Sequence, residues 1–378
     1  MRAASHGARI AIATNNGDIG GGEVMLLNVA EALRELDIEV LVIGPAGPGD
    51  LVAEAAHRGF STIALPAQGR RAYMLALLRW RLRNRRIPLW CNGLVPSTAT
   101  AGIGPRIVHL HILPTGLQKV AVQVARLGAR ATLVPSSFMA QRIPGARVLA
   151  NWTIDIARRE PTDDNVAPRR VGYLGRITRD KGVDVLANAM SQVIAAGAGD
   201  GRLLLAGENR FGTEEDDRAI SGALAPIADH VDQPGWIDRE DFFAAIDLAV
   251  FPSIWPESFG MTVAEAMAAG VPFVITDVGA LPEVAGTDHP WVVPAGDDGA
   301  LAAAITAALA DSDSSSASGT SGRYEQADAA RARWEQEFSP AAGRRRVAEL
   351  LAQLPDLGRR PADGARPIDP TNPQEASR

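Results

Sequence analysis

The sequence predicts an α/β protein with two doubly wound parallel sheets. Its 378 residues are too many for one comfortable core, whereas two domains of ordinary size fit this length. Short apolar runs alternate with amphipathic helical segments in two successive series, which is typical of parallel sheets covered by helices. A polar stretch at 155–169, with two prolines, separates the two series and predicts a linker between domains.

The first series opens with a strand at 10–14, a glycine loop at 17–22, a helix at 23–36 and a strand at 39–43. Five apolar residues of this helix share one face and support a β–α–β unit, namely Val24, Leu27, Ala30, Leu33 and Leu36. The remaining elements of this series are predicted as strands at 62–65, 89–91, 107–110 and 132–134, and helices at 72–84 and 116–126.

The second series follows the same pattern. We predict strands at 170–174, 202–206, around 231, 248–252 and 272–276, and helices at 183–195, 216–225, 240–246, 262–269 and 299–310. A Ser/Gly-rich stretch at 311–323 predicts a mobile loop. The segment 328–354 reads as helical with a break at Pro340, and the proline-rich segment that follows predicts a disordered tail.

Composition excludes several classes of protein. No run of about 18 apolar residues is present, so no membrane-spanning helix is expected. No apolar leader precedes the first strand, and a cytoplasmic location is the default expectation. The single cysteine, Cys91, excludes an internal disulfide and a cysteine-based metal cluster.

Charge is divided unevenly along the chain. The segment 55–154 contains 14 Lys and Arg residues and no Asp or Glu. The first 154 residues hold 17 basic and 8 acidic residues, a net charge of +9, although the whole chain carries −6. This asymmetry indicates either an anionic partner for the N-terminal half or attraction between the two halves.

The segment 249–277 carries the most specific pattern. A buried strand ends at Pro252, a loop follows, and a helix begins near Gly260 with Glu257 before it and Glu265 within it. The helix N-terminus offers free N–H groups and a positive dipole end, and Gly260 permits close approach of a ligand. A carboxylate can accept hydrogen bonds from two vicinal hydroxyls, as in a ribose.

This stretch, Pro256-Glu-Ser-Phe-Gly-Met-x-x-x-Glu265-Ala-Met-Ala-x-Gly-x-Pro272, resembles the Glu-x7-Glu signature of the retaining family 4 glycosyltransferases. The resemblance implies the GT-B fold, in which two Rossmann-like domains face each other across a cleft and a C-terminal helix crosses back to the first domain. It assigns Glu257 to the transferred sugar and Glu265 to the ribose. It also assigns backbone amides of Phe259, Gly260 and Met261 to the ligand. A solvated helix face is the alternative explanation.

A second block, 171–184, resembles the family's diphosphate clamp through Arg176 and Lys181. Two fixed cations would stabilise the charge left on the β-phosphate when the glycosyl–phosphate bond breaks. Ordinary exposed side chains are the alternative, and Arg179 is expected to be a bystander. Weaker matches place Gly207 in a glycine turn and Trp236 beside the nucleobase, although a packed core tryptophan fits equally well.

In the N-terminal half, Gly21 and Gly22 belong to a stretch that resembles the family's first glycine loop, which faces the donor phosphates. His111 follows a strand and resembles the family's strand-end histidine near the reacting sugar. A structural histidine is the alternative, and His109 shares the same strand face. The resemblance implies retention of anomeric configuration, a nucleotide-sugar co-substrate (UDP- or GDP-sugar), no other cofactor and no metal.

The segment 69–86 contains seven arginines among apolar residues that include Trp80. Such a basic amphipathic helix can lie on anionic lipid or bind the diphosphate of a lipid-linked acceptor, and an ordinary surface helix is the alternative. Peripheral contact with the inner face of the membrane through 69–86 therefore stays open. The acceptor is not identified by sequence, nor is the base or the sugar, and no nucleic acid is expected.

The resemblance implies four parts. These are an N-terminal acceptor-binding domain at 1–160, a nucleotide-sugar-binding domain at 161–340, a returning helix at 341–355 and a disordered tail at 356–378. Two other classes of protein fit the sequence less well. A dinucleotide-dependent oxidoreductase needs a Gly-x-Gly-x-x-Gly loop that this chain lacks. A non-catalytic GT-B-like scaffold would have lost the clamp or the glutamate pair, and all four residues are present.

Overall fold

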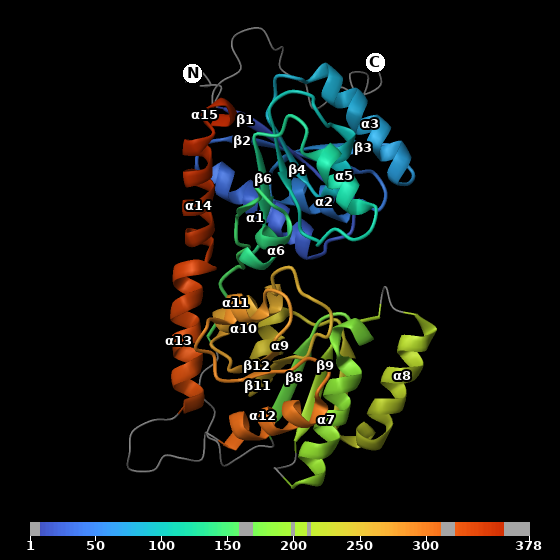
Figure 1. Cartoon of the computed structure of the whole chain (residues 1–378), viewed down its shortest axis with the longest axis vertical. Coiled ribbons are helices and arrows are strands. Elements are labelled where there is room, and N and C mark those ends of the chain that lie inside the picture. Colours follow the sequence, from blue (N-terminus) through green and yellow to red (C-terminus); the bar gives the residue numbers. More distant parts are fainter. Residues whose placement is uncertain (1–7, 159–168, 198–200, 210–212, 311–321, 359–378) are drawn as a thin grey trace. The chain divides into compact units, whose positions relative to one another are not determined.

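The computed structural model describes residues 8–158, 169–197, 201–209, 213–310 and 322–358. It divides into two compact units, Met1–Asn151 with Pro340–Arg378, and Trp152–Ser339 (Figure 1). Each unit contains one parallel sheet covered by helices. Two doubly wound α/β domains, the predicted fold class, are therefore confirmed.

The first unit has a seven-stranded sheet in the order β3-β2-β1-β4-β5-β6-β7. Its strands are β1 (Arg9–Ala13), β2 (Glu39–Pro45), β3 (Ser61–Leu65), β4 (Leu89–Asn92), β5 (Arg106–His109), β6 (Ala131–Val134) and β7 (Arg147–Val148). Its helices are α1 (Gly21–Glu35), α2 (Asp50–His57), α3 (Arg70–Arg83), α4 (Leu94–Ala99), α5 (Gln118–Ala125), α6 (Ser137–Arg142), α14 (Pro340–Gln353) and α15 (Pro355–Gly358). The strand order reverses between β1 and β4, and ligands of such sheets bind beyond the carboxyl ends of the strands at this point.

The second unit has a six-stranded sheet in the order β10-β9-β8-β11-β12-β13. Its strands are β8 (Arg170–Leu174), β9 (Arg202–Ala206), β10 (Val231–Gly235), β11 (Leu248–Phe251), β12 (Phe273–Thr276) and β13 (Val292–Val293). Its helices are α7 (Val183–Ala195), α8 (Glu214–Leu224), α9 (Arg239–Ala244), α10 (Met261–Ala269), α11 (Leu281–Ala285), α12 (Asp298–Ala310) and α13 (Gly322–Glu337), with short 3-10 turns η1 (Arg179–Lys181) and η2 (Ala225–His230). Its strand order reverses between β8 and β11.

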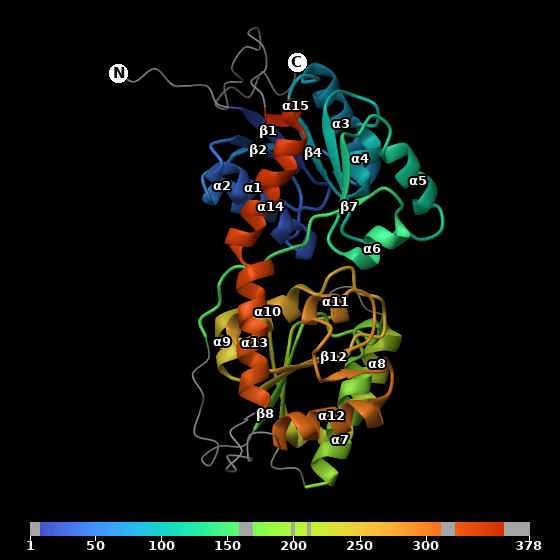
Figure 2. The same cartoon turned by 60° about the vertical axis from the view of Figure 1, so that its left-hand side comes forward.

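The long C-terminal helix α14 belongs to the same unit as β1. Helix α14 packs along α1, and Arg344 Nη1 lies 2.5 Å from Glu35 Oε2 (Figure 2). Pro340 is the first residue of α14, where its missing N–H costs nothing, and α13 ends at Glu337. The helix break therefore falls at the proline, as the sequence predicts.

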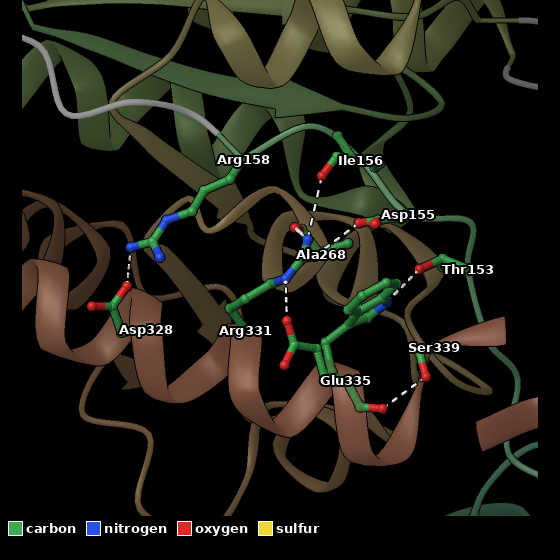
Figure 3. A network of polar contacts seen from close by, with 10 residues as sticks. Thr153, Asp155, Ile156, Arg158, Ala268, Asp328, Arg331, Glu335 and Ser339 are labelled. Atoms are coloured by element: carbon green, nitrogen blue, oxygen red, sulfur yellow. Dashed lines mark hydrogen bonds and ion pairs between the residues drawn. The ribbon is translucent and has the colours of Figure 1, made fainter. Parts of the chain in front are cut away.

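The segment 152–158 packs against α13 in the second unit (Figure 3). Trp334 Nε1 donates to Thr153 Oγ1 at 2.8 Å, and Thr153 N donates to Phe338 O at 3.0 Å. Arg331 pairs with Asp155 at 2.9 Å and also donates to the carbonyls of Ile156 and Ala268. These bonds explain why the division between units falls after Asn151, whereas the sequence places the boundary at 160/161.

Parts of three sequence-based predictions lie outside the described residues: most of the linker at 155–169, the loop at 311–321 and the tail at 359–378. The start of the predicted tail is α15, whose Leu357 is buried. The roles assigned to the four predicted parts of the chain stay predictions.

Candidate functional site

The predicted site residues of the second unit follow the two strands at which the strand order reverses. Arg176 and Lys181 come after β8, and Glu257 and Glu265 come after β11. Parallel strands end at the same edge of the sheet, so the two loops meet there. Backbone N–H groups of Ile254 and Trp255 in the second loop both donate to the carbonyl of Asp180 in the first, at 3.1 Å.

Gly182 makes this approach possible. It adopts φ +70°, and a Cβ at this position would lie 1.9 Å from the carbonyl oxygen of Pro252. Only glycine tolerates both the left-handed conformation and the contact. The loop after β8 is thus fixed against the loop after β11.

Lys181 and Glu257 form an ion pair between the two loops. Lys181 Nζ donates to Glu257 Oε1, and Ser253 Oγ donates to the same oxygen at 2.8 Å. Both charged side chains keep about a fifth of their surface exposed. The pair therefore lies at the surface of the unit, where a ligand can reach both charges.

Arg176 lies in the same loop and points toward solvent. Its Nη2 is 3.0 Å from Asp180 Oδ2, and Tyr173 Oη donates to its carbonyl at 2.5 Å. Arg179 instead pairs with Asp184, on α7, at 3.2 Å. Lys181 is thus the cation that pairs with Glu257, Arg176 lies in the same loop beside Asp180, and Arg179 is engaged with a helix.

Glu265 is the buried carboxylate of the site. Its side chain is 5% exposed and its Oε1 lies 2.7 Å from Arg239 Nε, at the start of α9. Burial raises the pKa of Glu265 to about 7, although Arg239 opposes this shift. Its second oxygen has no hydrogen-bond partner among the described residues. An acceptor atom without a partner can accept a hydrogen bond from a ligand hydroxyl.

Helix α10 carries Glu265 and begins in the loop that holds Glu257. Gly260, at φ +102°, turns the chain into the helix at Met261. Phe259 is buried and packs edge-to-face on Phe338, which fixes the turn. The N–H groups of the first helical turn have no intrahelical partners and remain available as donors.

Gly207 lies where two strand ends approach each other closely. Gly207 N donates to Gly235 O at 2.8 Å, and a Cβ on Gly207 would lie 1.8 Å from the carbonyl of Gly175. Glycine is therefore required there for close approach of two strand ends.

Trp236 is 62% exposed, so the alternative that this tryptophan packs in the core is wrong. Near β10, a hollow of about 470 Å³ is lined by Ile177, Asn209 and Gln233, among others.

The predicted residues of the first unit also gather where the strand order reverses. Asn92, at the end of β4, donates through Nδ2 to Gly22 O at 3.0 Å and lies 2.7 Å through Oδ1 from His111 Nε2. A Cβ on Gly22 would lie 3.5 Å from the His111 ring. This network assigns the proton of neutral His111 to Nε2 and leaves Nδ1 as an acceptor. Burial lowers the pKa of His111 to about 4.

Gly21 is the first residue of α1, and the loop before it holds a buried carboxylate. Glu23 Oε1 accepts from Thr14 Oγ1 at 3.2 Å, and Glu23 Oε2 accepts from Gly20 N at 3.3 Å. Burial is the main cause of the raised pKa of Glu23. The Glu23 carboxylate thus links Gly20 of the glycine loop to Thr14, the residue that follows β1.

His109 has a structural position. It is fully buried, accepts from Trp90 Nε1 at 3.3 Å, and has a pKa well below the ordinary value because of burial. Its ring centroid lies 4.1 Å from that of His111. Of the two histidines, only His111 is partly exposed at the surface.

Sequence reasoning missed Asn92, Ser253 and Arg239. Asn92 carries a usable signal, because a polar residue at the end of a buried strand next to the reversal point faces the ligand edge. Arg239 lies in a polar helix start and Ser253 in a polar loop, and neither position has a distinguishing pattern. Their roles depend on which loops the fold brings together.

The basic segment 69–86 is more deeply packed than expected. Trp80, Tyr73 and Leu77 of α3 join the core of the first unit, and Arg81 is buried as well. Trp80 is only 9% exposed, so the idea that it lies at a membrane interface is wrong. Within the described residues, no helix is long and apolar enough to cross a bilayer, and no group of three metal-ligating side chains occurs.

Two parallel-sheet units, with a glycine loop at the reversal point of the first and the cations Arg176 and Lys181 at that of the second, fit a glycosyltransferase of the GT-B fold. The family model "Glycosyl transferases group 1" matches residues 168–311. The phosphatidyl-myo-inositol mannosyltransferase of Mycobacterium leprae is 30% identical over 332 residues, which cover 77% of this chain and 84% of that protein. The chain belongs to the group 1 glycosyl transferases.

Two further comparisons agree. The lipopolysaccharide core mannosyltransferase LpsB of Rhizobium meliloti is 35% identical over 159 residues, which cover 38% of this chain and 41% of that protein. The structure of HepE from Anabaena in complex with UDP-glucose superposes with a TM-score of 0.76 at 20% identity, covering 91% of this chain and 99% of that one. At this identity the second comparison shows the fold alone.

Proposed function

We propose that this glycosyltransferase moves a sugar, with retention of configuration, from a UDP- or GDP-sugar to an anionic or lipid-linked acceptor. The observation that carries the proposal is the Lys181–Glu257 ion pair between the loops after β8 and β11, with the buried Glu265 on the helix that follows the second loop. Cations beside a carboxylate fit a sugar diphosphate, and a buried carboxylate oxygen fits a ribose.

The proposed roles follow from these positions. Glu265 accepts hydrogen bonds from the ribose hydroxyls, Trp236 stacks on the base, and the turn at 259–261 offers backbone amides to the donor. The turn at Gly207 supports the strand end below the donor. Glu257 binds hydroxyls of the transferred sugar. HepE, solved with UDP-glucose, and relatives named mannosyltransferases support a nucleotide-sugar donor.

The transfer step needs no nucleophilic side chain of the protein. The bond between the anomeric carbon and the β-phosphate oxygen breaks while the acceptor oxygen bonds to the same face of that carbon. The acceptor proton passes to the leaving phosphate, whose negative charge Arg176 and Lys181 stabilise. For the first unit by itself, we propose that Gly21 and Gly22 let a ligand approach the backbone, and that Nδ1 of His111, which has no partner among the described residues, accepts a hydrogen bond from a ligand hydroxyl.

The acceptor is proposed from charge. The first 154 residues carry 17 basic and 8 acidic side chains, which favours an anionic group such as a lipid-linked phosphate. In the segment 69–86 the exposed arginines of α3 supply charge for peripheral contact with the inner face of a membrane. Independence from metal ions stays a prediction.

The test is calorimetric titration of the full chain with UDP, GDP, ADP and dTDP. We expect one nucleotide to bind, and Glu265→Ala to weaken binding at least tenfold because the ribose loses its acceptor. Glu240→Ala, an exposed carboxylate on the neighbouring helix α9, is the matched control and leaves affinity unchanged. Absence of binding by a folded sample, or equal loss in both variants, overturns the proposed donor site.

A further inference from the structure

Helix α5 exposes an apolar surface on the first unit. Leu117, at the start of the helix, is 88% exposed, and Ile112 in the preceding loop is 77% exposed. The exposed apolar residues of this region are Ile112, Leu117, Val120, Val124 and Leu127, which we call the α5 surface. A group of this size within 16 residues is unusual for a surface that faces only water.

The spacing of these residues aligns them on one side of the helix. Positions 117, 120, 124 and 127 follow the three- and four-residue steps of an α-helix. The opposite side holds Val122 and Ala125, which are buried, and Val122 packs in a core cluster with Val108 and Leu110. Helix α5 thus has two apolar sides, and the fold buries only the side that holds Val122 and Ala125. Figure 2 shows the helix at the edge of the first unit.

The border of the α5 surface is basic. Lys119, Arg126 and Arg130 lie within or just after the helix, and the whole segment 55–154 contains no acidic residue. Two copies of this chain docked through the α5 surface would bring like charges together, which opposes self-association. Apolar side chains framed by cations match a bilayer with anionic headgroups.

A hollow between the loop before α5 and the side of the helix that holds Val122 supplies further cations. It has a volume of about 500 Å³ and is lined by apolar side chains that include Leu113, Val122 and Ile143. Lys119 and Arg142 also line it. The guanidinium of Arg142 lies 3.7 Å from the centroid of the Phe138 ring, which holds it in place. A lipid phosphate can pair with these cations while its chains contact the apolar residues.

We propose that the α5 surface docks the protein on an anionic lipid bilayer. Helix α3 can add arginine charge to such contact but inserts less apolar surface, because Tyr73, Leu77 and Trp80 are buried in the core and only Leu75 and Leu82 are exposed among its large apolar residues. The loop 112–117 joins His111 to α5, so docking would bring the proposed acceptor side of the site to the membrane. In this respect the inference rests on the proposed transfer to a lipid-linked acceptor.

The experiment is flotation of the full chain with vesicles of phosphatidylcholine alone and of phosphatidylcholine with phosphatidylglycerol. The test variant is Leu117→Gln/Val124→Gln on α5. The matched control is Leu75→Gln/Leu82→Gln, which changes the two exposed apolar residues of α3. We expect the wild type and the control to float with anionic vesicles only, and the α5 variant to lose at least tenfold in bound fraction.

Three outcomes overturn the proposal. These are no flotation of the wild type, loss of flotation in the α3 control but not in the α5 variant, and a wild-type dimer that the α5 variant dissociates. UDP and GDP titrations of the same samples separate this inference from the proposed function. A variant that binds nucleotide normally but no longer floats supports docking, whereas flotation without nucleotide binding in the wild type supports docking and overturns the donor site.

Discussion

Lys181 Nζ donates a hydrogen bond to Glu257 Oε1, so the two residues assigned to the diphosphate and to the sugar form a direct ion pair. They come from loops after neighbouring strands, β8 and β11. A diphosphate that enters must share or replace this contact. The ion pair therefore holds both side chains near the positions in which a donor would meet them.

This pairing predicts opposite effects for its two members. Lys181→Ala should weaken nucleoside diphosphate binding at least tenfold, because the phosphate loses a cation. Glu257→Gln should strengthen it by up to about fivefold, since a partly exposed ion pair is worth at most about 1 kcal/mol. The same change should abolish sugar transfer. Calorimetry with UDP and GDP, together with a transfer assay, measures both.

Arg179→Ala is the control for these variants. Arg179 lies in the same loop but pairs with Asp184, so its loss should change affinity by less than about twofold. Equal weakening by Arg179→Ala and Lys181→Ala would show that only the net charge of the loop matters. That result would remove Lys181 from the proposed clamp.

Glu265 predicts a pH dependence. Its pKa is raised from 4.5 to about 7, so the folded state holds its proton more tightly than the unfolded state, and stability from this group falls as pH rises through that interval. Ribose hydroxyls donate to the ionised form, so affinity should rise about tenfold from about pH 6 to its plateau above about pH 8. Glu265→Gln should remove both dependences. Titrations and thermal melts at several pH values test this, and an unchanged affinity profile in Glu265→Gln would contradict it.

Most strands of both sheets could be predicted from sequence because they are short apolar runs, and the long helices could be predicted from their periodic apolar faces, whereas the two-residue strands β7 and β13 were missed. Five helices were missed, α2, α4, α6, α11 and α15, and all have eight residues or fewer. Segments this short carry too few turns for a periodic signal. The candidate site residues were found because they occur in strand-end loops with a recognisable local pattern.

What could not be predicted depends on contacts between distant segments. Arg239 approaches Glu265 only because α9 and α10 are packed together, and nothing in its local sequence indicates this. The arginines of 69–86 look alike in sequence, yet Arg81 is buried while Arg83 is exposed. Local sequence patterns therefore identify the loops of the site, whereas the burial and pairing of individual side chains can be known only from the fold.

Arg81 predicts a stability effect within this basic segment. Its guanidinium donates to the carbonyls of Ile103, Ile87 and Pro105 at 2.8, 2.5 and 2.9 Å, and burial lowers its pKa to about 10. Arg81→Met leaves the carbonyls of Ile103 and Ile87 without this donor and should reduce the free energy of unfolding by about 3–5 kcal/mol. Arg83→Met, on the exposed side of the same helix, should change it by less than about 0.5 kcal/mol. Urea unfolding compares the two, and similar values would refute the structural role of Arg81.

Gly182 and Gly197 form a matched pair that separates backbone strain from loop contact. Both adopt left-handed φ, +70° and +67°, but a Cβ on Gly182 would lie 1.9 Å from Pro252 O, whereas a Cβ on Gly197 meets nothing within 4 Å. Gly197→Ala should cost about 1–2 kcal/mol of stability and leave nucleotide affinity intact. Gly182→Ala carries the same strain and also pushes the β8 loop away from the β11 loop, so Lys181 and Glu257 separate. We expect it to weaken nucleoside diphosphate binding at least tenfold in samples that circular dichroism shows to be folded, and equal affinities for the two variants would mean that the close loop contact is dispensable for the site.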